Sequence, residues 1–343
     1  MTSQQPQLIE TEVRDPDLLA RITGSGFLRD TVYRQCVTEQ AKRDALVAMP
    51  PIQRRRAKIS HAIAEAAAPS RDSLRHIHSV LAICSLPYNK LPDNKRQWES
   101  QQGRMKLSVS AGRLMGPDGN WVDQPVPYGT RARMMMMHVC SEAIRTNSAT
   151  VHVEDTLCGF IRALGYSPTG GKNGTITSFK QQINALAACN MQIGWQDGRL
   201  GKTLNTSPFA SMSAEMFNDE PNQRTLWPTE LKLSHEFYTS LSKHALPVST
   251  HAMRAFSNSP RKIDLMWWLG YRIYTAKEDI HLSWENLKDQ WGAGYSRFNN
   301  FKRDLALEIA DIKDVFPKLP VFLSENGCVI HPGSSEVLAV PHK

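Results

Sequence analysis

The sequence has few cysteines, and none of them forms a metal-binding pair. Six occur in 343 residues, and no two have the C-x2-C or C-x4-C spacing of zinc knuckles and ribbons. Most lie within apolar helical stretches, where cysteine packs as a small hydrophobic residue. We therefore expect reduced thiols and no bound metal. The six are Cys36, Cys84, Cys140, Cys158, Cys189 and Cys328.

Long hydrophobic runs are also missing. The most apolar stretches, such as residues 134–137 and 265–269, are far shorter than the roughly 18 residues of a membrane helix. Residues 1–15 have neither a basic start followed by an apolar stretch nor an Arg-rich amphipathic pattern, so no export signal is expected. With 41% hydrophobic residues and a mean hydropathy of −0.40, the composition is typical of a soluble globular protein. We expect a cytoplasmic protein of about two domains.

The sequence shows no grouping of a nucleophile, a base and an orienting residue. Its 11 histidines are dispersed, and no Gly-x-Ser-x-Gly turn occurs. His76 and His78, followed by Tyr88 and Lys90, imitate the metal-binding and nucleophilic parts of rolling-circle nicking enzymes, which need both histidines on one face of a strand. Here apolar residues at helical spacing predict a helix, on which residues two apart do not face each other. Those apolar residues are Leu74, Ile77, Leu81 and Cys84.

A glycine-rich stretch before residue 175 imitates a nucleotide-binding P-loop but fails its pattern twice. Tyr166 stands where the first glycine is required, and Asn173 replaces the Ser or Thr that would bind magnesium. Such a turn at a helix N-terminus can still hold a DNA phosphate, with Lys172 adding charge, or it is simply a flexible loop. We therefore expect no enzyme activity and no cofactor.

Positive charge is in excess. The 41 Lys and Arg outnumber the 33 Asp and Glu, giving a formal net charge of +8 and a pI of about 9.2, which favours nucleic acid as the partner. The densest basic cluster comprises Arg54, Arg55, Arg56 and Lys58. It is either a solvated helix face or a face that contacts phosphates.

Periodicity and turn residues divide the chain into four parts. We predict an N-terminal helical segment at 1–85, a domain at 86–228 that a β-hairpin opens near Met105, a second domain at 229–335, and a tail at 336–343. Each domain contains helices followed by a hairpin, the first near residues 191–197 and the second around the turn Ser-Glu-Asn-Gly at 324–327.

The two domains repeat one pattern at an offset of 122 residues. Amphipathic helices predicted at 175–188 and 297–313 share apolar positions and a lysine, and each precedes a hairpin, the element order of a winged helix-turn-helix. Two helices with helical spacing also align by chance, and that alternative stays open. The expected fold is α+β, mainly α, with two tandem winged helix-turn-helix domains after the helical segment. The aligned pairs are Ile176 with Phe298, Phe179 with Phe301, Lys180 with Lys302, Ile183 with Leu305 and Ala187 with Ile309.

Short motifs between residues 100 and 335 resemble the plasmid-encoded RepA family of replication initiators. The resemblance lies in PYGTRARMMMMHVCSEAIRT, FIRALGYSPTGGKNGTITSFKQQINAL, IDLMWWLGYRIY and LSWENLKDQWGAGYSRFNNFKRDL. Met266 stands where the family often has an aromatic residue, and Trp291 replaces its usual phenylalanine. The first hundred residues match only at Leu86-Pro87-Tyr88.

The resemblance implies a protein that binds repeated sequences (iterons) at a plasmid origin, helps to open the duplex, and recruits the host initiator, helicase and chaperones. It also implies inactive dimers, and the alternating Leu107 and Val109 could form an edge strand for pairing. Two alternatives remain: a metal-dependent DNA-nicking replication enzyme, and a transcriptional repressor that uses the same winged helices.

The expected DNA contacts lie on the polar faces of the two amphipathic helices and on the adjoining loops. With Phe298, Phe301, Leu305 and Ile309 turned inward, the helical period leaves Arg and Asn outward, and these side chains can read guanine and adenine. The lysines suit phosphates instead. The predicted contacts are Lys172, Asn173, Thr175, Thr177, Lys180, Gln181, Asn184, Tyr295, Ser296, Arg297, Asn299, Asn300, Lys302, Arg303 and Asn326.

Overall fold

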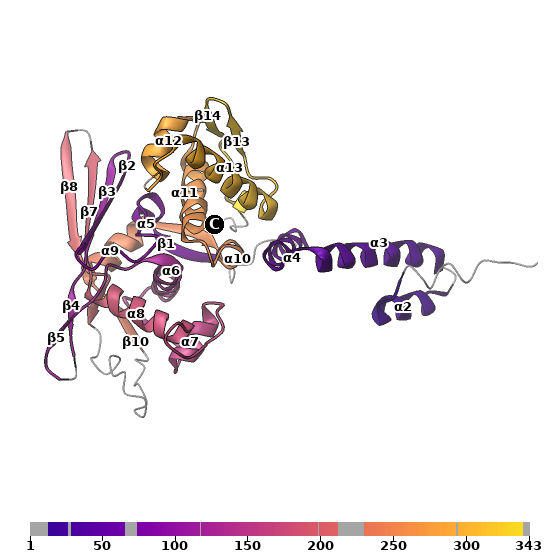
Figure 1. Cartoon of the computed structure of the whole chain (residues 1–343), viewed down its shortest axis with the longest axis horizontal. Helices are drawn as coiled ribbons and strands as arrows, with labels where there is room; N and C mark the ends of the chain where they lie inside the picture. Colours follow the sequence, from indigo (N-terminus) through magenta and orange to yellow (C-terminus); the bar gives the residue numbers. More distant parts are fainter. Residues whose placement is uncertain are drawn as a thin grey trace, which may run out of the picture. The chain divides into compact units, whose positions relative to one another are not determined.

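The computed structural model (Figure 1) describes residues 13–26, 29–65, 74–116, 118–197, 199–211, 230–292 and 294–338. It mixes helices with antiparallel sheets, so the expected α+β class is confirmed. The chain forms two compact units, Met1–Glu65 and Ala66–Lys343. Within the described ranges, no helix combines the length and apolar character needed to cross a membrane.

The first unit consists of helices α2 (Pro16–Thr23), α3 (Arg29–Ala48) and α4 (Pro51–Glu65). Its small core joins α2 to α3 through Leu18, Ile22 and Cys36. Arg43 of α3 adds ion pairs to acidic residues at the start of α2. Helical structure expected for this part of the chain is confirmed.

The first described element of the second unit is a strand where we predicted a helix. Strand β1 (Leu74–His78) pairs antiparallel with β11 (Ala245–Ser249), and helix α5 (Ser79–Ile83) follows at once. The apolar spacing looked helical because the strand passes directly into that helix. The pairing partner lies far along the chain, so local periodicity gave the wrong structure for residues 74–78.

A four-stranded antiparallel sheet has the order β2-β3-β7-β8. Its strand β3 lies between two neighbours, and Leu107 and Val109 are buried. The prediction that these residues form an open edge strand is therefore wrong. The hairpin expected near residues 191–197 is confirmed as β7 and β8. The strands are β2 (Gln97–Gln102), β3 (Met105–Ser110), β7 (Asn190–Asp197) and β8 (Leu200–Thr206).

Helices and two smaller sheets complete the first half of this unit. Strands β4 (Arg113–Met115) and β5 (Trp121–Asp123) form a separate hairpin, and a three-stranded sheet has the order β6-β10-β9. The predicted helix at 175–188 is confirmed as α8. The remaining elements are α6 (Gly129–Thr146), β6 (Thr150–His152), α7 (Leu157–Ala163), α8 (Thr175–Ala188), β9 (Phe209–Ser211) and β10 (Glu230–Leu233).

The second half contains the other predicted amphipathic helix and hairpin. Strand β12 pairs with β14, which pairs with β13 across the predicted turn. The expected boundary at 228/229 and the end of the tail at 339–343 lie outside the described residues. The elements are α9 (His235–His244), α10 (Thr250–Ala255), α11 (Pro260–Thr275), β12 (Ile280–Ser283), α12 (Trp284–Trp291), α13 (Phe298–Val315), β13 (Val321–Ser324), β14 (Gly327–Ile330) and the 3-10 helix η4 (Ser335–Leu338).

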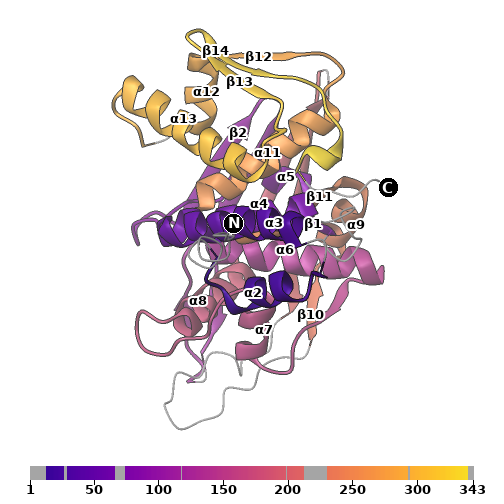
Figure 2. The same cartoon turned by 90° about the vertical axis from the view of Figure 1, so that its right-hand side faces the viewer.

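Within the second unit, the two amphipathic helices lie toward opposite ends. In both views, α12, α13 and their hairpin occupy one end, α7 and α8 the other, and α6 and α11 lie between them (Figures 1 and 2). Arg133 of α6 and Asp264 of α11 form a buried ion pair, with 1% and 2% of their side chains exposed. The two halves are therefore joined through a charged contact in their common core.

Candidate nucleic-acid interface

Helix α13 separates apolar from polar residues as its sequence predicts. Phe301, Leu305 and Ile309 are buried, whereas the predicted contacts at its N-terminal end are exposed. Those exposed residues are Ser296, Arg297, Asn299, Asn300 and Arg303. No side chain caps the start of the helix, so its positive N-terminal end lies beside these arginine and asparagine side chains.

One apolar residue of α13 is not turned fully inward. Phe298, which we expected in the core, is only partly buried, and two lysines lie over its ring. Lys302 Nζ is 4.8 Å from the Phe298 ring centroid and 5.3 Å from that of Trp284. Its charge is thereby held on a defined side of the helix, because the aromatic faces attract the cation.

Tyr295 positions the loop before α13. Its hydroxyl accepts a hydrogen bond from Arg261 at 2.5 Å and donates one to Asp304 at 3.1 Å. The Arg261 guanidinium lies 4.9 Å from the Tyr295 ring centroid and is ion-paired with Glu308 at 3.0 Å. These contacts tie the loop to α11. Its DNA contact stays a prediction.

Arg303 also has a protein partner. Its Nε donates to Asp304 at 2.9 Å, and this hydrogen bond holds the pKa of the Asp304 carboxyl below its usual range. The Arg303 side chain is nevertheless 65% exposed. Because an exposed ion pair is worth little, the guanidinium can exchange this partner for a DNA group.

Asn326 lies in the turn between β13 and β14. The residue is exposed, and its backbone N–H donates to Ser324 Oγ at 3.3 Å. Gly327 follows with a φ of +151°, and a side chain there would clash with the carbonyl oxygen of Leu282. The turn is thus fixed with Asn326 facing outward from the protein core.

At the start of α8, three threonines close the glycine-rich turn. Thr175 Oγ1 accepts from Thr169 N at 2.8 Å and donates to the Ser167 carbonyl at 2.8 Å, while Thr169 Oγ1 accepts from Thr175 N at 2.9 Å. Thr177 likewise donates to the Gly171 carbonyl at 2.9 Å. The hydroxyl groups of Thr175 and Thr177, both predicted DNA contacts, therefore donate their hydrogen bonds within the turn. Lys172 and Asn173 remain exposed on it.

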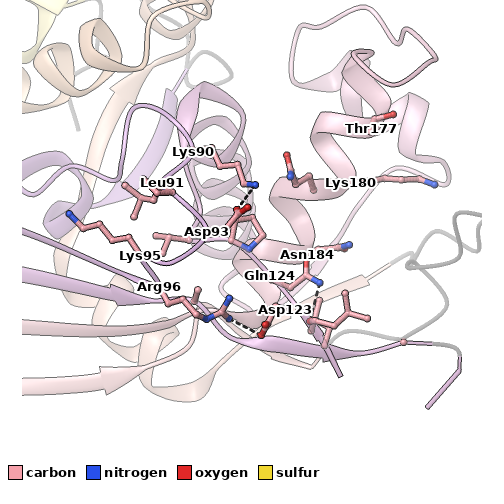
Figure 3. Close-up of a pocket in the computed structure, with 18 of the residues that line it drawn as sticks. Lys90, Leu91, Asp93, Lys95, Arg96, Asp123, Gln124, Thr177, Lys180 and Asn184 are labelled. Atoms are coloured by element: carbon pink, nitrogen blue, oxygen red, sulfur yellow. Dashed lines mark hydrogen bonds and ion pairs between the residues drawn. The ribbon is translucent and has the colours of Figure 1, made fainter. Parts of the chain in front are cut away.

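The polar face of α8 forms one wall of a cleft of about 720 Å³ (Figure 3). The opposite walls come from residues 90–96 and from the β4–β5 hairpin. Gln181 is partly engaged, because its Oε1 accepts from the Tyr128 hydroxyl at 2.9 Å. The predicted contacts that line the cleft are Lys172, Thr177, Lys180, Gln181 and Asn184.

The cleft is rich in positive charge. It is lined by five basic residues, Lys90, Lys95, Arg96, Lys172 and Lys180, and by two acidic ones. Asp93 pairs with Lys90 at 2.7 Å and Asp123 with Arg96 at 3.2 Å. The hydrogen bond from Lys90 lowers the pKa of the Asp93 carboxyl, so the acid stays ionised. Five cations against two anions leave the cleft suited to phosphate groups.

The sequence analysis missed Lys95 and Arg96 as site residues. They lie in a loop that also contains Asn and Pro, PYNKLPDNKR at 87–96, far in sequence from α8. The clustering of basic residues in this loop was a signal for a binding site. That the loop lies close to α8 depends on tertiary structure, which the periodicity of the sequence does not report.

His76 and His78 lie on strand β1 rather than on a helix, so our reason for setting them aside is wrong. His78 Nδ1 accepts from Val80 N at 3.1 Å, and Nε2 is 2.9 Å from Ser240 Oγ. Since Nδ1 accepts, Nε2 carries the proton and donates. Burial lowers the pKa of His78 to about 3. Both ring nitrogens are thus occupied by protein partners, and no cluster of His, Cys, Asp or Glu suited to a metal occurs in the described ranges.

Tyr88, which would be the nucleophile of such a nicking site, is partly buried. Its ring centroid lies 5.4 Å from the Arg133 guanidinium, and burial raises the pKa of its hydroxyl. A phenol that resists ionisation is a poor nucleophile.

In the N-terminal basic cluster, Arg54 has a structural role. Its guanidinium donates to the carbonyls of Leu46 at 2.8 Å and Met49 at 3.0 Å, and also to that of Val47, closing the end of α3. Arg55 and Lys58 are exposed.

Comparison with known proteins supports the resemblance inferred from the sequence. A family model described as "Plasmid encoded RepA protein" matches residues 126–286, which include α6, α8 and α11. No curated protein matches the chain. A crystal structure of selenomethionine derivatives of domains 2 and 3 of RctB is similar with a TM-score of 0.41 at 11% identity, covering 72% of this chain and 89% of that chain.

Proposed function

Because residues 126–286 belong to the plasmid-encoded RepA family, we propose that this protein initiates plasmid replication by binding repeated sequences (iterons) in duplex origin DNA. It then helps to open the duplex and recruits the host initiator, helicase and chaperones, as the family resemblance implies. It does so without a catalytic centre of its own. The family match carries this proposal, and the exposed polar end of α13 identifies the residues that would contact DNA.

The second half supports a winged helix most directly. Helix α11 is followed by strand β12, then by helices α12 and α13, and then by the β13–β14 hairpin, whose sheet β12 completes by pairing with β14. This is the order of a winged helix-turn-helix, in which the third helix enters the major groove. In this proposal α13 is the recognition helix, and Asn326 lies at the tip of the wing.

The first half follows the same order of elements with a different sheet. Helices α6, α7 and α8 precede the β7–β8 hairpin, but β6 pairs with β10 instead of completing that hairpin's sheet. We therefore place sequence readout on α13. The first half would add contacts to the DNA backbone through its lysines.

A nuclease footprint on the replicon that encodes the chain tests the proposal. We expect protection of directly repeated sequences at the origin, unaffected by chelation and dialysis, because the chain contacts DNA through its own side chains. Protection confined to a promoter would instead establish the repressor. Absence of any protected site would overturn the proposed function.

The nicking alternative has a test of its own. Incubation of the chain with supercoiled plasmid and magnesium or manganese should leave the plasmid intact. Relaxation that is lost in His76→Ala would establish a nicking enzyme.

A further inference from the structure

Arg303 shares the exposed face of α13 with two asparagines. Residues three and four apart on a helix are neighbours, so Arg303 lies beside Asn300 and Asn299. All three residues are exposed, and 65% of the Arg303 side chain is open to solvent. An arginine grips guanine through two parallel hydrogen bonds, which require its planar guanidinium to lie in one orientation. The contacts that orient Arg303 therefore bear on what α13 can read.

The guanidinium of Arg303 is held along one edge. Asp304 Oδ1 accepts a hydrogen bond from Arg303 Nε at 2.9 Å and lies 2.9 Å from Nη2. Both contacts use the side of the planar fork, so Nη1 and the outer hydrogen of Nη2 are left to point away from Asp304. Two donors at the end of the fork can grip the O6 and N7 atoms of guanine. Arg303 can therefore keep its protein partner while it contacts a base.

Asp304 is fixed in turn by a residue outside the helix. Its Oδ2 accepts a hydrogen bond from the Tyr295 hydroxyl, and the same hydroxyl accepts one from Arg261 of α11. Arg261 is mostly buried, with 11% of its side chain exposed, and is ion-paired with Glu308. A chain of polar contacts thus runs from the core of this half to the exposed Arg303.

Tyr295 is itself anchored on several sides. Its ring packs edge-on against the buried Phe301, with the ring centroids 5.6 Å apart, and the Arg261 guanidinium lies 4.9 Å from the Tyr295 centroid. Its backbone N–H donates to the Gly292 carbonyl at 3.0 Å. Burial raises the pKa of the Tyr295 hydroxyl, so at neutral pH it keeps the proton that it donates to Asp304.

We propose that Arg303 reads one base pair of the origin repeat and that Asp304 and Tyr295 hold it in the orientation for doing so. Arg261 fixes the Tyr295 hydroxyl from the core. Asp304, Tyr295 and Arg261 are positioning residues, and none of them needs to touch DNA for this role. Ordering a long side chain in advance removes a cost that binding would otherwise carry. The inference deepens the proposed function and rests on it.

The test measures, by fluorescence anisotropy, the affinity of the full chain for an origin repeat and for copies that each carry one changed base pair. Arg303→Ala should lose roughly 5- to 150-fold in discrimination at one base pair, which identifies the position that Arg303 reads. Asp304→Ala should lose about 2- to 12-fold at that same position, the cost of ordering one long side chain. Its affinity for random duplex should not fall, because the change removes an anion from the DNA-facing surface.

Two further variants separate positioning from other roles. Asp314→Ala removes the same charge from the exposed last turn of α13, about 16 Å along the helix from Arg303, and should keep discrimination at every base pair. Tyr295→Phe removes only the hydroxyl. It should reduce discrimination at the position that Arg303 reads, but cause no further loss when combined with Arg303→Ala. A Tyr295 hydroxyl that contacted DNA directly would cause its loss in both backgrounds.

The inference is overturned if Asp304→Ala keeps full discrimination, if it weakens all base pairs equally, or if the Tyr295→Phe loss persists beside Arg303→Ala. A second measurement needs no DNA. With nitrogen-15 arginine in the chain, NMR should show the Arg303 Nε–H exchanging with water more slowly than in Asp304→Ala, and equal exchange would also refute the inference. If exchange is slowed but the origin repeat is not bound, the proposed function fails while the contact between Asp304 and Arg303 stands. Circular dichroism confirms that each variant is folded.

Discussion

Removing Asp264 should destabilise the second unit more than almost any other single change. The Arg133 guanidinium donates five hydrogen bonds: two to the Asp264 carboxylate, at 2.6 and 2.7 Å, and three to the backbone carbonyls of Leu86, Pro87 and Gly129. With 1% of its side chain exposed, Arg133 has no access to water if the carboxylate is lost. Arginine cannot give up its proton, so Asp264→Ala leaves a buried, uncompensated charge.

The expected cost is about 3–5 kcal/mol, the range for breaking one side of a buried ion pair. At about 2–4 °C per kcal/mol for domains of this size, Tm should fall by about 6–20 °C in a thermal melt followed by circular dichroism. Arg145→Ala on the same helix is the control. Its side chain is 69% exposed and pairs with Glu142 at the surface, so its loss should cost less than about 1 kcal/mol.

A double-mutant cycle refines the test. Arg133→Met leaves Asp264 unpaired, and burial already raises the pKa of that carboxyl, so this variant can recover part of its loss by taking up a proton. The double variant Arg133→Met with Asp264→Ala removes both charges. Its loss in free energy of unfolding should be about 3 kcal/mol smaller than the sum of the losses of the two single variants. Some loss will remain, because three backbone carbonyls lose a donor. Penalties that simply add would refute the argument that the two charges depend on each other.

The other predictions concern the site and the buried histidine. Arg297→Ala or Asn300→Ala should weaken binding to the cognate site far more than binding to random duplex, whereas Lys302→Ala should weaken both and reduce the slope of log affinity against log salt by about one. Titrations at several salt concentrations check this. Equal losses of affinity on cognate and random DNA for Arg297→Ala and Asn300→Ala would mean that α13 contacts only the DNA backbone. Because burial holds the pKa of His78 near 3 while the unfolded value is about 6.5, the unfolded chain binds more protons between these values, so stability falls as pH drops. We expect a loss of about 2 kcal/mol from pH 7 to pH 5, absent in His78→Gln, measured by urea unfolding; an equal pH slope in both chains would contradict it. Gly174→Ala should distort the turn before α8, since its Cβ would lie 2.3 Å from the Thr169 carbonyl oxygen, and a thermal melt unchanged from that of the unaltered chain would disprove this.

Local patterns sufficed for the helices that carry the predicted contacts. Helix α8 spans residues 175–188 as predicted, and α13 begins at Phe298, one residue after the predicted start. In both, the apolar period and the adjoining glycine or turn residues lie within one short window, so the sequence alone reports them.

Features that depend on distant partners were not predictable in this way. Strand β1 forms against β11, and five residues give no periodicity strong enough to distinguish a strand from the start of a helix. The cleft joins α8 to residues 90–96 and to a hairpin at 113–123, three segments that only the tertiary fold brings together. Leu107 and Val109 alternate as a strand should, but alternation does not say how many neighbours the strand has.

The pairing of β1 with β11 also affects how the protein is made. Strand β1 leaves the ribosome about 170 residues before its partner, and the bonds at Leu74 and His78 form only after Ser249 and Ala245 have been added. At roughly 5–20 residues per second, the strand waits about ten to thirty seconds. Throughout that interval Ile77 lacks its partner strand. Arg133, once it is added, lacks its carboxylate until Asp264 follows. A nascent chain stalled before residue 245 would therefore expose both to proteases and chaperones, whereas one released after Asp264 would not.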